Sequence, residues 1–143
     1  MRSDRLQRII ELKELLMEEK ERILDQHNKE RDIIQSNVDL LNDQIDANYS
    51  ELCTRCFDGN EFALLTNYLE HLGHLKMTAL TQEELLEKRI ALVRAQLYDM
   101  LKEIKMLDTL KERTLSADRR AQKRKHQKLL DEIALRLESR KVR

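Results

Sequence analysis

The sequence predicts an all-α protein: a long antiparallel two-helix coiled-coil hairpin with an overhanging basic C-terminal helix end. The chain has 143 residues with no proline and two glycines, so it offers few places to turn. Only 3% of the residues are aromatic and 38% are charged, and the frequent residue types are strong helix formers. Two series of apolar residues with heptad spacing flank one turn signal. This pattern is typical of a narrow seam between long helices and not of a compact enzyme with a pocket.

The first helix is predicted over about residues 3–57. Seven positions spaced seven apart form its main series: Ile10, Met17, Leu24, Arg31, Val38, Ile45 and Leu52. Further apolar residues are expected to support this seam: Leu6, Ile9, Leu16, Ile23, Ile34 and Leu41. A polar stretch over residues 25–32 weakens the seam in the middle of this helix.

The turn is predicted at residues 58–60, within Phe57-Asp58-Gly59-Asn60. Asp-Gly is common in turns, and Gly59 can adopt a positive φ without strain. The first helix is expected to end at this turn, and a second helix is expected to begin after it.

The second helix is predicted over about residues 61–140. Twelve of fourteen positions with alternating spacings of three and four residues are apolar, the exceptions being Lys76 and Glu83. The fourteen positions are Phe62, Leu65, Leu69, Leu72, Lys76, Ala79, Glu83, Leu86, Ile90, Val93, Leu97, Met100, Ile104 and Leu107. Gly73 and the capping-box pattern Thr81-Gln82-Glu83-Glu84 could each break the helix. The register continues across both of them, so we expect one continuous helix, with at most a bend near residues 73–81.

An antiparallel hairpin about this turn pairs residues whose numbers total about 118, which places Arg31 opposite Glu87. At about 1.5 Å per residue, the first helix spans about 85 Å and is used up near residue 116 of the second. The heptad series also ends there, through Lys111, Thr114 and Asp118. Residues 117–143 are therefore predicted to extend beyond the paired helices, and we call them the overhang. A basic cluster lies in it: Arg119, Arg120, Lys123, Arg124, Lys125 and Lys128.

The formal net charge of zero conceals a gradient along the chain. Residues 1–60 carry 9 basic and 14 acidic side chains, whereas residues 109–143 carry 12 and 5. No window is long and apolar enough to span a membrane, and the charged start does not resemble an export signal. We therefore expect a cytoplasmic protein with no transmembrane segment, in which both cysteines are reduced thiols.

The only metal-like pattern is Cys53-Thr54-Arg55-Cys56 followed by His71-Leu72-Gly73-His74. Its spacing is close to that of a Cys2His2 zinc site. In a helical hairpin, however, His71 lies level with about residue 47, roughly 9 Å of helix rise away from Cys53. We expect no metal and no cofactor. The sequence also lacks a nucleophile with a base, a phosphate loop or a cluster of carboxylates, so we expect no catalytic residue and no enzyme activity.

The overhang admits three interpretations: a site for an acidic protein, a site for nucleic acid or lipid headgroups, or a solubilising tail. It lacks the aromatic residues and motifs usual in nucleic-acid binding. An apolar helical stripe follows the basic cluster instead: Leu129, Leu130, Ile133, Ala134 and Leu137. With Leu6, Ile9 and Ile10 of the other chain end, this tip suits insertion into a protein cavity with an acidic rim.

Two segments of the chain resemble the FliJ family of flagellar type III export proteins. The first is Leu6-Gln7-Arg8-Ile9-Ile10-Glu11-Leu12-Lys13-Glu14-Leu15-Leu16. The second runs from Leu110-Lys111-Glu112-Arg113 to Gln127-Lys128-Leu129-Leu130-Asp131-Glu132-Ile133-Ala134, which is similar to the closing stretch of the family. His126 stands where many members have glutamate. Stalk proteins of the YscO type, from injectisomes, are the near neighbours of this family.

The resemblance implies a non-enzymatic stalk and chaperone escort that serves flagellar biogenesis and motility. Its paired termini would enter the pore of the hexameric flagellar export ATPase and promote ring assembly and hydrolysis. Its body would contact the cytoplasmic domain of the export gate protein and recycle substrate-specific export chaperones, at the cytoplasmic face of the inner membrane. The matching ATPase-binding residues are Leu6, Ile9, Ile10, Arg119, Arg120, Lys123, Arg124, Leu130 and Ile133. The matching gate-contact residues are Tyr49, Tyr68 and Leu72, although Leu72 also occupies a seam position.

We therefore expect residues 1–143 to form a single coiled-coil hairpin that binds these proteins and no nucleic acid. A first alternative is a generic coiled-coil adaptor or homodimer, which would self-associate without affecting an ATPase. A second alternative is a small zinc-stabilised nucleic-acid-binding protein, with salt-dependent affinity for DNA.

Overall fold

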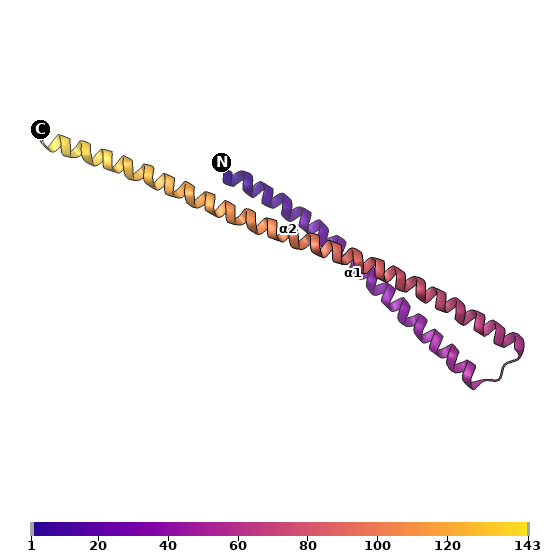
Figure 1. Cartoon of the computed structure of the whole chain (residues 1–143). Coiled ribbons are helices and arrows are strands. Elements are labelled where there is room, and N and C mark those ends of the chain that lie inside the picture. Colours follow the sequence, from indigo (N-terminus) through magenta and orange to yellow (C-terminus); the bar gives the residue numbers. More distant parts are fainter. Residues whose placement is uncertain (1, 143) are drawn as a thin grey trace. The chain divides into compact units, whose positions relative to one another are not determined.

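The computed structural model describes residues 2–142 and contains two long helices, α1 (Arg2–Thr54) and α2 (Gly59–Val142), joined by residues 55–58 (Figure 1). No strand occurs among these residues. The predicted all-α hairpin of two packed helices is confirmed. Relative to the predicted ranges, α1 ends three residues earlier than residue 57, and α2 begins two residues before residue 61.

Asp58 caps the N-terminus of α2, and this explains why the helix starts early. Its side-chain Oδ1 accepts a hydrogen bond from the backbone N–H of Glu61 at 2.8 Å, and its carbonyl accepts one from the N–H of Phe62 at 3.0 Å. Asp58 is therefore the N-cap residue, and Gly59 is the first helical residue. Gly59 does not use the positive φ that is open to glycine, since no glycine among the described residues has one.

The helix α2 is continuous through both of the positions that could have interrupted it. Thr81 does not act as an N-cap, because its hydroxyl donates back to the carbonyl of Met77 at 2.9 Å within the helix. A Cβ at Gly73 would meet no atom within 4 Å, so this glycine lies in an ordinary helical position with open space beside it. The expectation of one uninterrupted second helix is confirmed.

The chain divides into two compact units, each of which combines one segment of α1 with one segment of α2. Unit 1 comprises Met1–Met17 and Asp99–Arg143, and unit 2 comprises Glu18–Tyr98. Each unit buries a narrow line of apolar side chains between its two segments. The buried apolar residues are Ile10 and Ile104 in unit 1, and Val38, Leu69, Leu72, Leu86, Ile90 and Val93 in unit 2.

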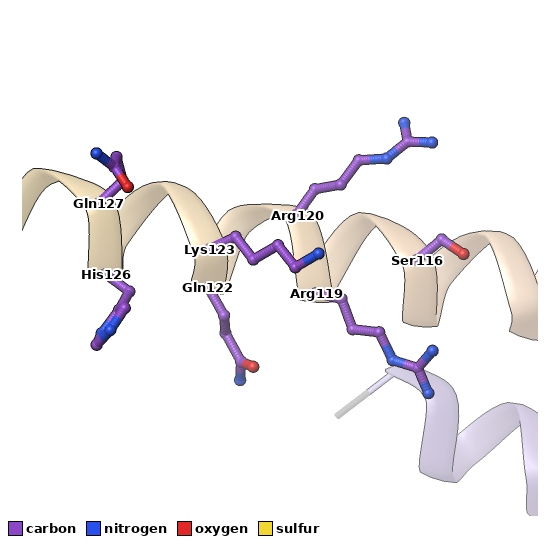
Figure 2. Close-up of a pocket in the computed structure, with 7 residues that line it drawn as sticks. All are labelled: Ser116, Arg119, Arg120, Gln122, Lys123, His126 and Gln127. Atoms are coloured by element: carbon purple, nitrogen blue, oxygen red, sulfur yellow. The ribbon is translucent and has the colours of Figure 1, made fainter.

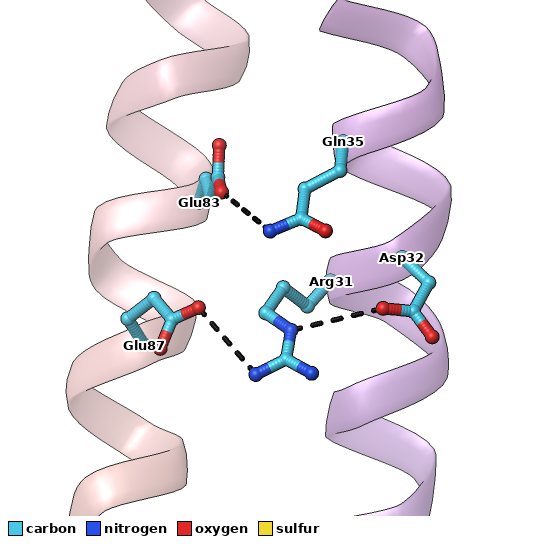
Figure 3. A network of polar contacts seen from close by, with 5 residues as sticks. All are labelled: Arg31, Asp32, Gln35, Glu83 and Glu87. Atoms are coloured by element: carbon cyan, nitrogen blue, oxygen red, sulfur yellow. Dashed lines mark hydrogen bonds and ion pairs between the residues drawn. The ribbon is translucent and has the colours of Figure 1, made fainter.

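The pairing register follows the predicted rule in both units. In unit 2, Arg31 Nη1 lies 3.6 Å from Glu87 Oε1, and Gln35 Nε2 donates to Glu83 Oε1 at 3.0 Å (Figure 3). Arg31 Nε also lies 3.8 Å from Asp32 Oδ1. The numbers of both cross-helix pairs total 118, so the predicted juxtaposition of Arg31 with Glu87 is confirmed.

Unit 1 shows the same register through polar pairs. Lys111 Nζ donates to Gln7 Oε1, and again the two residue numbers total 118. Lys13 forms an ion pair with Glu103, which lies two residues from the position level with Lys13 in this register. Polar groups that must meet across the seam penalise a shifted pairing, so these contacts fix the register more than they add stability.

The α1 side of the seam differs from the prediction at two of the six supporting positions. Ile9 and Leu16 are exposed, so their assignment to the seam was wrong. A strict three and four spacing from Ile10 instead brings polar residues to the half-buried positions: Lys13, Lys20, His27, Arg31 and Asn48. The apolar residues were chosen by hydropathy, whereas the helical period decides which side chains face the partner helix.

Candidate functional site

The overhang is the exposed end of α2 in unit 1. Every residue from Ser116 to Lys141 is exposed, whereas Lys111, Thr114 and Leu115 just before it are half-buried. The described residues 117–142 carry nine basic and four acidic side chains. The predicted basic extension beyond the paired helices therefore matches the exposure pattern along α2.

The side chains of the basic cluster point to more than one side of the overhang helix. A shallow hollow on α2 is lined by Ser116, Arg119, Arg120, Gln122, Lys123, His126 and Gln127. Figure 2 shows Arg119 reaching toward the start of α1, Arg120 on the opposite side of α2, and Lys123 between them. The guanidinium and ammonium groups are thus spread around the helix, an arrangement suited to a partner that surrounds it.

The paired part of unit 1 ends at the first turn of α1, and the overhang of α2 begins at that level. Ser3 is buried there, and a second hollow brings Arg2 and Ser3 of α1 together with Arg119 and Lys125 of α2. Ser3 was not among the residues predicted from the sequence. It lies seven residues before Ile10 and so continues the heptad series of α1, but serine is not apolar, and hydropathy therefore does not mark it as a seam residue.

The predicted ATPase-binding residues fall into two groups in the structure. Exposed members are Ile9, Arg119, Arg120, Lys123, Arg124, Leu130 and Ile133. By contrast, Ile10 is only 2% exposed and packs in the seam, and Leu6 is half-buried beside Leu110 and Thr114. A partner can reach the first group directly, whereas Leu6 and Ile10 hold the base of the overhang in place.

A groove lies in unit 2 close to the turn, and we call it the near-turn groove. Its lining comes from both helices: Tyr49 and Leu52 of α1, and Thr66, Leu69, Glu70, Gly73, His74 and Met77 of α2. The open space beside Gly73 contributes to it, because a side chain there would project into solvent without touching another atom. From the sequence, Gly73 was predicted only as a possible helix break, and a lone glycine gives no signal for a groove.

The three predicted gate-contact residues differ in their exposure. Tyr49 is exposed and lines the near-turn groove. Tyr68 is also exposed but does not belong to the lining. Leu72 is 3% exposed, so its side chain packs in the seam and is closed to a partner, as its heptad position suggested.

The residues of the zinc-like pattern are separate in the structure. Cys53 and Cys56 are free and exposed, and His74 Nε2 lies 3.9 Å from Glu70 Oε1 one turn away. Among residues 2–142, no group of three or more His, Cys, Asp or Glu side chains is placed to hold a metal ion. The spacing along the sequence therefore does not bring these residues together as a set of ligands among the described residues.

No helix in the described part of the chain is apolar over a length that could cross a membrane. The comparisons found no matching relative among curated proteins and no matching solved structure. The family model described as the flagellar FliJ protein matches residues 1–143, which is the whole chain. Members of this family are non-enzymatic components associated with flagellar protein export. The two-helix fold, its register and this full-length match together place the chain in the FliJ family.

Proposed function

We propose that the protein is a stalk of the flagellar type III export apparatus whose overhang binds inside the ring of the hexameric export ATPase. The observation that carries this proposal is the exposure of every residue from Ser116 to Lys141 on a helix that is otherwise packed. A single helix without a partner is marginally stable in water. Enclosure by a ring supplies the missing contacts.

The chemistry of the overhang supports a protein cavity with an acidic rim as its site. Nine basic side chains attract such a rim and steer the stalk into it. The exposed side chains of Leu130 and Ile133 then add apolar contact further along the same helix.

The test is to mix the full chain with the cognate export ATPase and to measure ATP hydrolysis and ring formation. We expect stimulation of both by the wild-type protein. Charge reversal of Arg119, Arg120 and Arg124 to glutamate should abolish the stimulation, and 500 mM salt should weaken it through screening.

A matched control reverses three exposed basic residues outside the overhang, Arg89, Arg94 and Lys105, and changes the net charge by the same amount. This variant should stimulate the ATPase like the wild type. An ATPase that does not respond to the wild-type protein would refute the stalk function. Equal losses in the two variants would refute the role of the overhang.

We further propose that the exposed residues near the turn contact the cytoplasmic domain of the export gate protein. Tyr49 offers a partly exposed aromatic ring beside the open space at Gly73, and aromatic residues dominate the energetics of many interfaces. Tyr68 offers a second exposed ring at nearly the same level of α2. Substrate-specific chaperones would then be handed over at the cytoplasmic face of the inner membrane.

Binding of the purified gate domain to Tyr49→Ala and Tyr68→Ala variants tests this contact. We expect each substitution to weaken binding by about tenfold or more if the ring is an interface anchor. Leu92→Ala is the matched control, because Leu92 is an exposed apolar residue of the same unit. Affinity unchanged in both tyrosine variants would exclude these rings from the contact.

A further inference from the structure

The near-turn groove has the form of a site that accepts an amphipathic helix. Leu52, Leu69 and Met77 supply apolar surface, and Gly73 leaves the space above α2 free. Amphipathic helices bind such grooves through apolar residues at positions i, i+3, i+4 and i+7. The chemistry of the surroundings decides which helix fits.

The surface around the groove is acidic. Residues 39–80 carry seven acidic and two basic side chains. Of the two basic residues, Arg55 lies 3.7 Å from Glu51 and stacks over the Phe57 ring at 5.6 Å, whereas Lys76 is half-buried in the seam. Glu70, the carboxylate in the groove lining, lies 3.9 Å from His74 Nε2, so the excess of negative charge belongs to the surrounding residues 39–80, and it favours a basic occupant.

The overhang has both properties that this occupant needs. Leu130, Ile133, Ala134 and Leu137 follow the i, i+3, i+4 and i+7 pattern and are exposed. At about 100° per residue, Arg136 and Arg140 lie beside Ile133 on the helical wheel.

On the same wheel, Lys141 and Arg140 lie about 30° and 70° from the centre of the four apolar residues, whereas Glu138, Asp131 and Glu132 lie about 90°, 110° and 150° from it. One face of the overhang is thus apolar and basic, which complements a groove that is apolar and acidic.

We propose that the near-turn groove of one copy of this chain binds residues 129–141 of a second copy. Each chain carries both halves of the contact, so the interaction is heterologous and joins two different surfaces. Docking covers the exposed apolar stripe of the overhang and orders a helix that lacks other packing. This self-association does not depend on the ATPase or on the export gate.

The test measures the molar mass of the full chain by sedimentation equilibrium from 1 to 200 μM, in 50 mM and 500 mM salt. We expect association that rises with concentration and is at least about tenfold weaker at the higher salt, since opposite charges attract across the contact. Gly73→Leu should block it, because the new side chain occupies the groove without a clash inside its own chain. Gly73→Ala is the matched control and should retain it.

The overhang is tested by Arg136→Glu combined with Arg140→Glu, which reverses the charge beside the apolar anchors. Each of the two defective variants should be monomeric alone. An equimolar mixture should form a one-to-one dimer, because the intact overhang of the Gly73→Leu chain can bind the intact groove of the charge-reversed chain. The Gly73→Leu variant keeps an intact overhang, so its stimulation of the ATPase should persist.

Three results would overturn the proposal. One is a wild-type protein that stays monomeric at 200 μM. Another is self-association that survives either blocking change, which would point to a different surface. The third is the absence of a dimer in the mixture, which would mean that the groove and the overhang do not bind each other.

Discussion

Replacing Ile90 by alanine should be among the most damaging single changes in unit 2. Ile90 is 1% exposed and is the largest fully buried side chain among the described residues. The substitution removes three carbon groups from the seam, worth about 0.8 kcal/mol each, or about 2.4 kcal/mol in total. A residual cavity raises the cost, and isoleucine-to-alanine changes in protein cores span about 2–5 kcal/mol.

Two features hold the expected loss near the lower end of that range, at about 2.5–3 kcal/mol. The seam has only two helices, so its side chains can relax toward the vacated space more readily than in a layered core. The pairing register also places Ile90 level with residue 28, next to the half-buried polar side chains of His27 and Asn28. With alanine at position 90, these polar groups lie closer to water, and this reduces the cost of the substitution.

The assay is urea-induced unfolding followed by circular dichroism, together with amide hydrogen exchange over residues 83–97. Leu92→Ala is the control, because Leu92 is 60% exposed on the same helix and should cost at most about 0.5 kcal/mol. Exchange should accelerate around residue 90 only in the Ile90→Ala variant. Equal losses of stability in both variants would refute the assignment of Ile90 to the seam and of Leu92 to the surface.

Three further predictions concern the turn, the groove and the register. Asp58→Ala should lower the stability of unit 2 by about 0.5–2 kcal/mol through loss of the N-cap, whereas Asp58→Asn should be nearly neutral in the same urea assay; equal effects would exclude capping. Gly73→Ala should raise stability by about 0.5–1 kcal/mol, because alanine restricts the unfolded chain and meets no atom within 4 Å; a lower urea midpoint would contradict the open space. A double-mutant cycle of Arg31→Ala and Glu87→Ala should give a coupling energy of about 0.2–1 kcal/mol, as for partly exposed pairs, and a coupling of zero would show that this pair does not form in solution.

The sequence predicted the α2 side of the seam better than the α1 side. Leu69, Leu86 and Ile90 are buried at their heptad positions, because on α2 the apolar residues and the helical period coincide, except at Phe62, which is exposed. On α1 they diverge, and Lys13 and His27 occupy half-buried positions that hydropathy alone assigns to the surface. A long side chain can place its stem in the seam and its charge at the edge, which a hydropathy pattern does not detect.

The candidate sites show the same division. The basic cluster and its exposure were predictable, because Arg119 and Arg124 lie where the heptad series ends. The near-turn groove was not, because it depends on side chains of two helices and on open space at one glycine. Leu72 illustrates the limit most directly: the family resemblance suggested a contact residue, whereas packing against α1 leaves it 3% exposed.

The sequence by itself determined the helical fold, the single turn, the pairing register and the basic end. These follow from local propensity and from a repeat that runs along the whole chain, and neither needs distant residues to be placed first. Only the tertiary structure decided which side chains are reachable. It placed Ile10 and Ser3 out of reach, left Ile9 exposed, and formed a groove beside Gly73. Exposure is a property of two helix surfaces brought together, so it becomes defined only when both are in place.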